Sequence, residues 1–141
     1  MSGDEGGLAF FDTNVLVYAD DATSPNQQEK AIAVFAGYLR RGTAVVSLQV
    51  LQEYFAVATR KLGLAPEVAQ RKWRSWLAPV VPFDAGDVIA AFGLHRLTQV
   101  SFWDALIVHA ARSAGARVLF SEDVHAGTIL GGVRVVNRFA T

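Results

Sequence analysis

The first apolar run of the chain, Leu8-Ala9-Phe10-Phe11, ends directly at the carboxylate of Asp12. A short apolar run of this kind predicts a buried β-strand. Four further runs predict strands in the same way, and they cover residues 44–46, 80–83, 117–120 and 133–136. Because Pro82 has no backbone N–H to donate, the strand that contains it is expected to be short or to lie at a sheet edge.

Segments with helical periodicity separate these strands. They run from Asn26 to Arg41, from the N-cap Ser47 to the stop at Gly63, from Glu67 to Leu77, from the N-cap Asp84 to Leu97, and from the N-cap Ser101 to Gly115. The second helix carries an apolar stripe on one side, and Val50 and Val57 lie on the opposite side with Glu53, so this helix is apolar on two sides. The stripe consists of Leu48, Leu51, Phe55, Ala58 and Leu62. Strands that alternate with helices are typical of an α/β sandwich with a mainly parallel sheet.

The length of 141 residues and the hydrophobic fraction of 52% predict a single domain over residues 1–141 with a real core. Residues 1–7 are polar and glycine-rich, which predicts a short frayed leader and not a signal peptide. The absence of cysteine excludes disulfides, thiolate nucleophiles and zinc–thiolate sites. No apolar stretch is long enough to cross a membrane, so we expect a cytoplasmic protein.

Carboxylates gather where the carboxyl ends of the predicted parallel strands would meet, which is where open α/β sheets bind ligands. Asp12 follows the first strand, and Asp123 lies shortly after the fourth. Glu53 lies in the helix after the second strand. Asp104 lies in the first turn of a helix that is apolar on nearly every face, so this helix and its carboxylate are expected to be buried. Four carboxylates without a basic partner repel one another, and Mg²⁺ or Mn²⁺ would relieve that repulsion.

Each of these carboxylates also has a purely structural explanation. Asp12 and Asp123 can form an Asx-turn or cap a helix, Asp104 can interact with the helix dipole, and Glu53 can be a surface residue. Glu122 competes with Asp123 for the role of ligand. The combination of all four favours a metal site more than any single residue does.

Four segments, in order along the chain, resemble the motifs of PIN domains, especially those of VapC-type toxins. They are residues 11–18, which begin Phe11-Asp12-Thr13-Asn14, and residues 46–54, 101–107 and 119–123. Residues 131–137 are similar to the end of the family, although Asn137-Arg138-Phe139 stands where Asn-Pro-Phe is often found.

The resemblance implies a PIN-like three-layer α/β/α sandwich with a parallel sheet of about five strands, often assembled as a homodimer. It implies an endoribonuclease that hydrolyses RNA phosphodiester bonds with Mg²⁺ or Mn²⁺ and acts as the toxin of a toxin–antitoxin pair. A VapB-type antitoxin would block the site and would make the contacts to promoter DNA. The catalytic and metal-binding positions would be Asp12, Glu53, Asp104 and Asp123. Asn14 and Ser121 could hydrogen-bond these carboxylates or serve only as turn and cap residues.

Binding of RNA requires cations, yet the formal net charge is zero, with 13 basic and 13 acidic residues. This balance is less basic than a nucleic-acid-binding protein usually shows. Five basic residues do cluster around Trp73 and Trp76, and they are Arg60, Lys61, Arg71, Lys72 and Arg74. They could bind phosphates while the tryptophans stack on bases. The alternative is a solvated helix face with its tryptophans in the core, which we favour for the tryptophans.

Two other functions stay open. A haloacid-dehalogenase-like phosphatase also places an aspartate after its first strand, but Asn14 stands where its second acid would be. A catalytically inactive PIN-fold binding module is the other alternative, although all four acidic positions are present.

Overall fold

The centre of the molecule is a sheet whose inner strands consist of buried and almost wholly apolar residues. In the computed structural model, which describes residues 7–124 and 127–139, six strands pair in the order β3-β2-β1-β4-β6-β5. Five are parallel to their neighbours, and β5 is antiparallel to β6. The strands are β1 (Ala9–Phe11), β2 (Ala44–Ser47), β3 (Val80–Val81), β4 (Val118–Phe120), β5 (Ile129–Leu130) and β6 (Val133–Val136). The predicted mainly parallel α/β fold is therefore confirmed.

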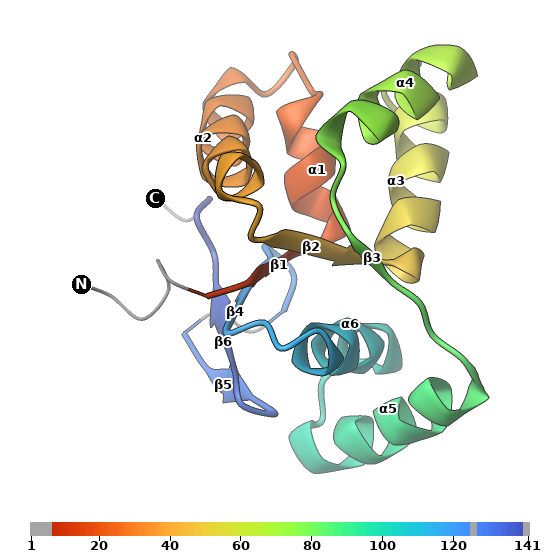
Figure 1. The fold of residues 1–141 in the computed structure, drawn as a ribbon, viewed down its shortest axis with the longest axis vertical. Coiled ribbons are helices and arrows are strands. Elements are labelled where there is room, and N and C mark those ends of the chain that lie inside the picture. Colours follow the sequence, from red (N-terminus) through yellow and green to blue (C-terminus); the bar gives the residue numbers. More distant parts are fainter. Residues whose placement is uncertain (1–6, 125–126, 140–141) are drawn as a thin grey trace.

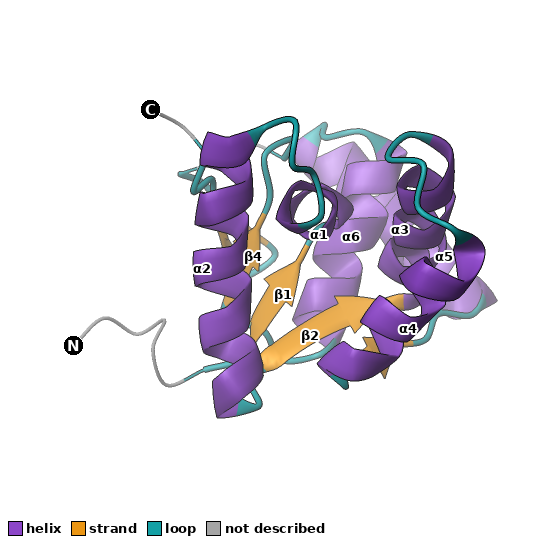
Figure 2. Ribbon diagram, turned by 90° about the horizontal axis from the view of Figure 1, so that it is seen from above, coloured by secondary structure: helices purple, strands orange, loops and turns teal. Residues whose placement is uncertain are grey.

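Helices cover both sides of this sheet (Figure 1). They are α1 (Thr13–Ala19), α2 (Pro25–Arg41), α3 (Leu48–Arg60), α4 (Pro66–Trp76), α5 (Ala85–Thr98) and α6 (Phe102–Ser113). Seen from above, α1 and α2 lie over β1, β2 and β4 (Figure 2), while α6 lies beneath the sheet with α5 on its outer side. Strands that are covered on both faces must be apolar throughout, which explains why β1, β2 and β4 contain only buried residues.

The helix boundaries follow from capping. The hydroxyl of Ser47 accepts the N–H of Val50 at the start of α3, and Ser101 caps α6 in the same way. Asp84 and Asp87 form a reciprocal capping box at the start of α5. Gly42 ends α2 in the left-handed region at φ 70°, a conformation that glycine adopts without steric cost. These starts and the end of α2 agree with the sequence prediction.

Two elements were not predicted. Helix α1 begins directly after Asp12, and its apolar run is too short to show a helical period. Strand β5 pairs with β6 through Gly131 and Gly132, whose φ angles of 57° and 84° are both positive. A two-residue turn of this type needs positive φ at both positions, which glycine supplies. The sheet consequently has six strands where about five were expected.

The structure shows which of the two apolar sides of α3 meets the core. The buried residues of this helix are Gln49, Val50, Tyr54 and Ala58, whereas Phe55 is 42% exposed. Helix α4 packs beside α3, and Leu51 and Phe55 line a groove there in place of the core. Apolar residues on two sides of a helix do not tell which side meets the sheet.

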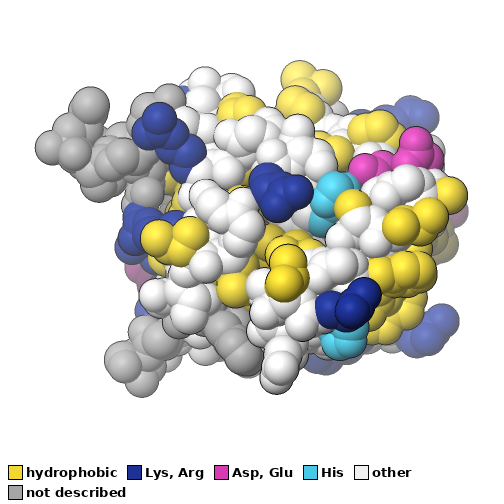
Figure 3. Space-filling model, turned by 90° about the horizontal axis from the view of Figure 1, so that it is seen from below, with side chains coloured by type: hydrophobic (Ala, Val, Ile, Leu, Met, Phe, Trp, Pro, Cys, Tyr) yellow, Lys and Arg dark blue, Asp and Glu magenta, His cyan; other side chains and the backbone are white. Residues whose placement is uncertain are grey.

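Apolar side chains also reach the surface on the far side of α5. Ile89, Phe92 and Leu97 are each more than half exposed, and the face that contains α5 shows such side chains clearly when the molecule is seen from below (Figure 3). None of the described helices is long and apolar enough to span a membrane. The predicted leader covers residues 1–7, of which 1–6 lie outside the described residues.

Candidate functional site

A hollow of about 290 Å³ lies between α1, α3 and the segment that follows β4. Three elements that are far apart in sequence meet here because β1 and β4 are neighbours in the sheet and α3 packs beside α1. The lining residues are Thr13, Asn14, Val17, Tyr18, Asp21, Glu53, Val57, Lys61, Glu122 and Asp123. Asp12, the N-cap of α1, directly precedes two of them.

Asp12 is buried, and both oxygens of its carboxylate accept hydrogen bonds. Oδ1 accepts the backbone N–H of Thr13 at 2.8 Å, and Oδ2 accepts the hydroxyl of Ser121 at 2.7 Å. Only 7% of Asp12 and none of Ser121 is exposed. Among the described residues no lysine, arginine or histidine forms an ion pair with Asp12. The carboxylate is thus fixed in orientation but not neutralised.

Burial raises the pKa of Asp12 to about 6, against the hydrogen bonds from Ser121 and Thr13, which lower it. The negative charges of Glu53 and Asp123 raise the same pKa further. Burial and like charges both oppose ionisation of a carboxyl group. Three carboxylates therefore share one electrostatic environment, in which a cation would be stabilised.

Ser121 and Asn14 hold the segment that carries Asp123. The oxygen of Ser121 accepts the N–H groups of Asp123 and Val124 at 3.1 and 3.2 Å. The side-chain amide of Asn14 donates to Oδ2 of Asp123 at 3.1 Å, and its oxygen accepts the N–H of Glu122 at 3.4 Å. The loop after β4 is thereby tied to the start of α1.

Glu122 and Asp123 have different partners at this hollow. The hydroxyl of Tyr18 donates to Oε1 of Glu122 at 2.9 Å, and this contact raises the pKa of Tyr18. Asp123 contacts Asn14 and acts on Asp12, as described above. The charge of Asp123 raises the pKa of Asp12, whereas Glu122 is hydrogen-bonded to Tyr18. The choice of Asp123 over Glu122 as a ligand stays a prediction.

Asp104 is not among the residues that line the hollow. It lies in the first turn of α6, where its N–H donates to the hydroxyl of Ser101. The expectation of a buried carboxylate is wrong, because Asp104 is only partly buried and Trp103 beside it is 65% exposed. Within residues 7–124 and 127–139, no three acidic or histidine side chains are close enough together to share an ion.

The five basic residues predicted to bind RNA have different surroundings. Lys72 pairs with Asp20 at 3.1 Å. Arg71 and Arg74 line a separate hollow beside α4, and Arg60 lies in the last turn of α3. Of the five, Lys61 lines the hollow of the carboxylates. Binding of RNA by these five residues stays a prediction.

Trp73 and Trp76 pack into the molecule, as favoured above. Their rings contact Tyr54 at centroid distances of 5.6 and 5.2 Å, and Trp76 also contacts Phe35. Both tryptophans are only partly exposed and pack against the core. They stabilise the contact between α4 and the rest of the domain and are not free to stack on bases.

Sequence analysis missed Tyr18, Asp21 and Lys61 as parts of the hollow. Tyr18 lies four residues after Asn14, and Lys61 lies eight residues after Glu53. Residues four apart share a helix face. The spacing from Glu53 therefore could have placed Lys61 on the same face of its helix, whereas Tyr18 and Asp21 could be placed only once α1 was known to be a helix.

Comparisons with known proteins agree with this architecture. The model of the PIN domain family matches residues 9–126. No curated protein matches the chain.

Solved structures with a similar fold come from several bacteria. A toxin–antitoxin complex from Klebsiella pneumoniae has a TM-score of 0.71 at 18% identity, over 94% of this chain and 99% of that one. VapC20 from Mycobacterium tuberculosis, described as a Sarcin-Ricin loop cleaving toxin, has a TM-score of 0.66 at 22% identity, over 89% and 98%. DNA-bound VapBC from Salmonella typhimurium has a TM-score of 0.66 at 19% identity, over 94% and 98%. At these identities the likeness concerns the fold.

Proposed function

The chain belongs to the PIN domain family, and on this basis we propose that it is a metal-dependent endoribonuclease that hydrolyses RNA phosphodiester bonds. One observation carries the proposal, and it concerns the buried carboxylate of Asp12. Two hydrogen bonds fix its orientation, and the negative charges of Glu53 and Asp123 raise its pKa. Among the described residues no cation forms an ion pair with it. An isolated buried carboxylate is costly unless something compensates it. A divalent cation that also binds the phosphate of a substrate would do so.

The residues at the hollow fit Mg²⁺ or Mn²⁺ by their chemistry. The side-chain donors around Asp12 are carboxylate, hydroxyl and amide oxygens, which are the ligands that hard cations prefer. Asp12, Glu53 and Asp123 would hold the ion. Because the three are not yet close enough to share it, we expect the exposed side chain of Glu53 to turn inward on binding. A bound ion would lower the pKa of a water and neutralise charge on the phosphate oxygens.

The chain's own residues would keep the carboxylates in place. Ser121 and Thr13 donate to the two oxygens of Asp12, so this side chain cannot rotate freely. Asn14 holds Asp123 from the first turn of α1. Such supporting hydrogen bonds fix the direction of a ligand's lone pairs. Asp104 is retained as a fourth candidate carboxylate on the strength of its sequence motif alone.

Within this proposal the protein is the toxin of a toxin–antitoxin pair that works in the cytoplasm. The same fold occurs in the complexes described as toxin–antitoxin from K. pneumoniae and as promoter-bound VapBC2 from Rickettsia felis. We therefore propose a VapB-type antitoxin as partner, with promoter DNA contacted through it. The exposed apolar side chains on α5 support a homodimer.

The inactive binding module is the remaining alternative, since the phosphatase does not agree with membership of the PIN domain family. Retained carboxylates do not by themselves produce turnover. The oriented state of Asp12 favours an active enzyme, because a binding surface gains nothing from an uncompensated buried charge. The alternative predicts that RNA is bound but never cut.

The proposal is tested by incubating purified protein, freed of any antitoxin, with total cellular RNA. Cleavage is compared with Mg²⁺, with Mn²⁺ and with EDTA, and the cut ends are mapped. Glu53→Gln is the test variant, and Glu29→Gln is its matched control, because Glu29 is an exposed glutamate on α2 away from the hollow. An Asp104→Asn variant, measured alongside, shows whether the fourth carboxylate takes part.

We expect discrete cuts that need the metal, persist in Glu29→Gln and disappear in Glu53→Gln. Equal cleavage by both variants would point to a contaminating nuclease and would contradict the assignment of Glu53. Binding of RNA without cleavage under every metal condition would favour the inactive module.

A further inference from the structure

Lys61 is a cation at the edge of an acidic hollow. It lines this hollow together with Glu53 and Val57. The three residues follow at intervals of four along α3, so they form one stripe on one side of the helix. Eight residues separate Glu53 from Lys61, which corresponds to about 12 Å along the helix axis. The stripe thus begins with a carboxylate and ends with an ammonium group.

The positive charge of Lys61 is not neutralised by an ion pair with another described residue. Its side chain is exposed. The charge of Lys61 lowers the pKa of Asp21, although the hydrogen bonds from Thr23 lower it more. Asp21 already accepts two hydrogen bonds from Thr23, at 3.0 and 2.6 Å. Lys61 is therefore available to an outside anion.

Lys72 shows what a structural lysine looks like in the same molecule. Its ammonium group lies 3.1 Å from Oδ1 of Asp20, a carboxylate whose side chain is only 4% exposed. Lys72 therefore joins α4 to the end of α1. Lys61 makes no such connection, although it lies in the same basic stretch of the sequence.

We propose that Lys61 binds a phosphate of the RNA strand close to the bond that is cut, so that the substrate runs along α3 from Glu53 toward Lys61. This inference rests on the proposed ribonuclease function and adds a direction for the bound strand. An RNA strand that enters this hollow meets the carboxylates of Glu53, Glu122 and Asp123. A lysine at the rim offers a mobile point charge that binds a phosphate without demanding one geometry, and it offsets that repulsion.

A purely structural role for Lys61 is the competing explanation. Lys61 is the C-cap of α3, where a positive charge interacts favourably with the helix dipole. This role predicts that loss of the charge lowers the melting temperature and leaves RNA binding unchanged. The proposed role predicts the reverse. The two explanations are therefore separable by measurement.

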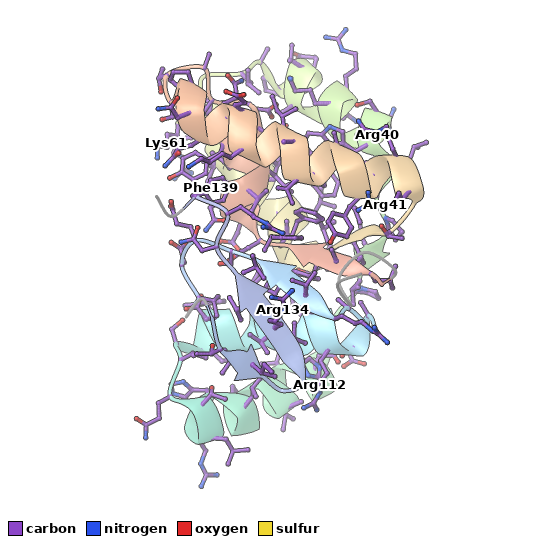
Figure 4. All side chains as sticks on the ribbon, turned by 90° about the vertical axis from the view of Figure 1, so that its left-hand side faces the viewer. Arg40, Arg41, Lys61, Arg112, Arg134 and Phe139 are labelled. Atoms are coloured by element: carbon purple, nitrogen blue, oxygen red, sulfur yellow. The ribbon has the colours of Figure 1, made fainter. Side chains whose placement is uncertain are left out.

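The experiment compares Lys61→Gln with Arg40→Gln in the full chain. Arg40 is an exposed cation in the last turn of α2, and it lies at the opposite end of α2 from Lys61 (Figure 4). Binding of a short single-stranded RNA is followed by fluorescence anisotropy at several KCl concentrations, with Ca²⁺ in place of Mg²⁺ to suppress cleavage. Cleavage of the same RNA with Mg²⁺ and thermal unfolding are measured on the same proteins.

For Lys61→Gln we expect Kd to rise about tenfold, as the loss of one charge-assisted contact implies. The slope of log Kd against log salt should fall by about 0.7, the contribution of one phosphate on a single strand. KM should rise with Kd while kcat changes little. Lys61→Arg should restore binding, and Arg40→Gln should behave like the unchanged protein.

The proposal is overturned if Lys61→Gln binds with the Kd and salt slope of Arg40→Gln while the unchanged protein binds and cuts RNA. In that case the ribonuclease function stands and only the direction of the strand is lost. If the unchanged protein binds no RNA at all, both the inference and the proposed function fail together.

Discussion

Helix α1 carries a buried carboxylate at each end, and only one of the two forms an ion pair among the described residues. Asp20, at its C-cap, accepts the hydroxyl of Tyr54 at 2.7 Å and pairs with Lys72 at 3.1 Å. Asp12, at its N-cap, accepts hydrogen bonds but has no cation beside it among the described residues. The nearby charges that act on Asp12 are the negative charges of Glu53 and Asp123.

The difference shows that burial alone does not mark a functional carboxylate. Asp20 is satisfied by the protein itself, and it connects the end of α1 to α3 and α4 through Tyr54 and Lys72. Asp12 accepts hydrogen bonds, but its negative charge is not neutralised by any described residue, so a cation from outside the chain would stabilise it. Perturbed carboxylates of this second type cluster at functional sites.

The largest expected effect separates the two residues by activity. Asp12→Asn should lower kcat/KM for RNA by more than about a hundredfold, which exceeds the loss from altering only a ligand's hydrogen-bond support. The amide keeps the shape of the side chain but supplies no negative charge for a cation. Asp20→Asn, measured as kcat/KM per folded molecule, should stay within about twofold of the unchanged protein because the control site lies outside the hollow. Equal losses in both variants would remove the distinction drawn here.

A smaller effect is expected where Asp12 is supported. Ser121→Ala removes the donor to Asp12 and also the acceptor for the N–H groups of Asp123 and Val124. We expect metal affinity or activity to fall about 10- to 100-fold, measured by titrating Mg²⁺ against the cleavage rate. Ser75→Ala is the control, because Ser75 is exposed and bonds only within α4. Full activity of Ser121→Ala at the original Mg²⁺ requirement would show that this hydrogen bond does not position Asp12.

At the other end of α1 the effect should appear in stability. Asp20→Asn should lower the free energy of unfolding by about 1–2 kcal/mol, because Lys72 loses its partner while Tyr54 keeps an acceptor. The side chain of Lys72 is 43% exposed, so water compensates part of the loss, which keeps the value below that of a fully buried pair. Urea unfolding measures it.

A double variant, Asp20→Asn with Lys72→Met, is the control for this stability effect. It should recover part of the loss, because no unpaired charge is left behind. If Asp20→Asn instead unfolds like the unchanged protein but loses cleavage, Asp20 belongs with the functional carboxylates after all.

The sequence carries enough information for the sheet but less for the site. Strands such as 117–120 are visible because burial on both faces demands continuous apolar residues. The starts of α3, α5 and α6 are visible because their caps are local hydrogen bonds between neighbouring residues. These features depend on short-range chemistry, which the sequence shows directly.

What the sequence did not show depends on packing between distant segments. The exposed side of α3 is decided by where α4 lies, so the sequence could not tell that Phe55 lies outside the core. Helix α1 is shorter than the window in which a helical period can be recognised. The separation of Lys61 from Lys72 also follows from tertiary structure, since one faces the hollow and the other meets Asp20. The four acidic positions were predicted from the sequence, but the effect of Glu53 and Asp123 on the pKa of Asp12 could come only from the structure.

The smallest expected effect is a pH dependence of stability that Asp12 contributes. Burial raises the pKa of Asp12 from 3.8 to about 6 in the folded protein, so the folded state holds this proton more tightly than the unfolded chain. Unfolding between these two values releases a proton, and the free energy of unfolding of the metal-free protein therefore falls as the pH rises from about 4 to about 6. The shift sets an upper bound of about 3 kcal/mol, and we expect about 1 kcal/mol because solvent reaches the neighbouring hollow.

Asp12→Asn is the control for this fall, because an amide does not titrate and the variant should lack it. Asp21 and Asp87 have lowered pKa values, so the stability they contribute is present above about pH 4 and is lost only at lower pH, outside the window. Urea unfolding at half-unit steps of pH, in EDTA and then in Mg²⁺, measures both effects. Mg²⁺ should reverse the fall above pH 6, because it binds the ionised carboxylates of the folded state alone. Identical profiles for the two proteins in EDTA would mean that Asp12 is not desolvated, and the contrast between the two ends of α1 would then rest on Lys72 alone.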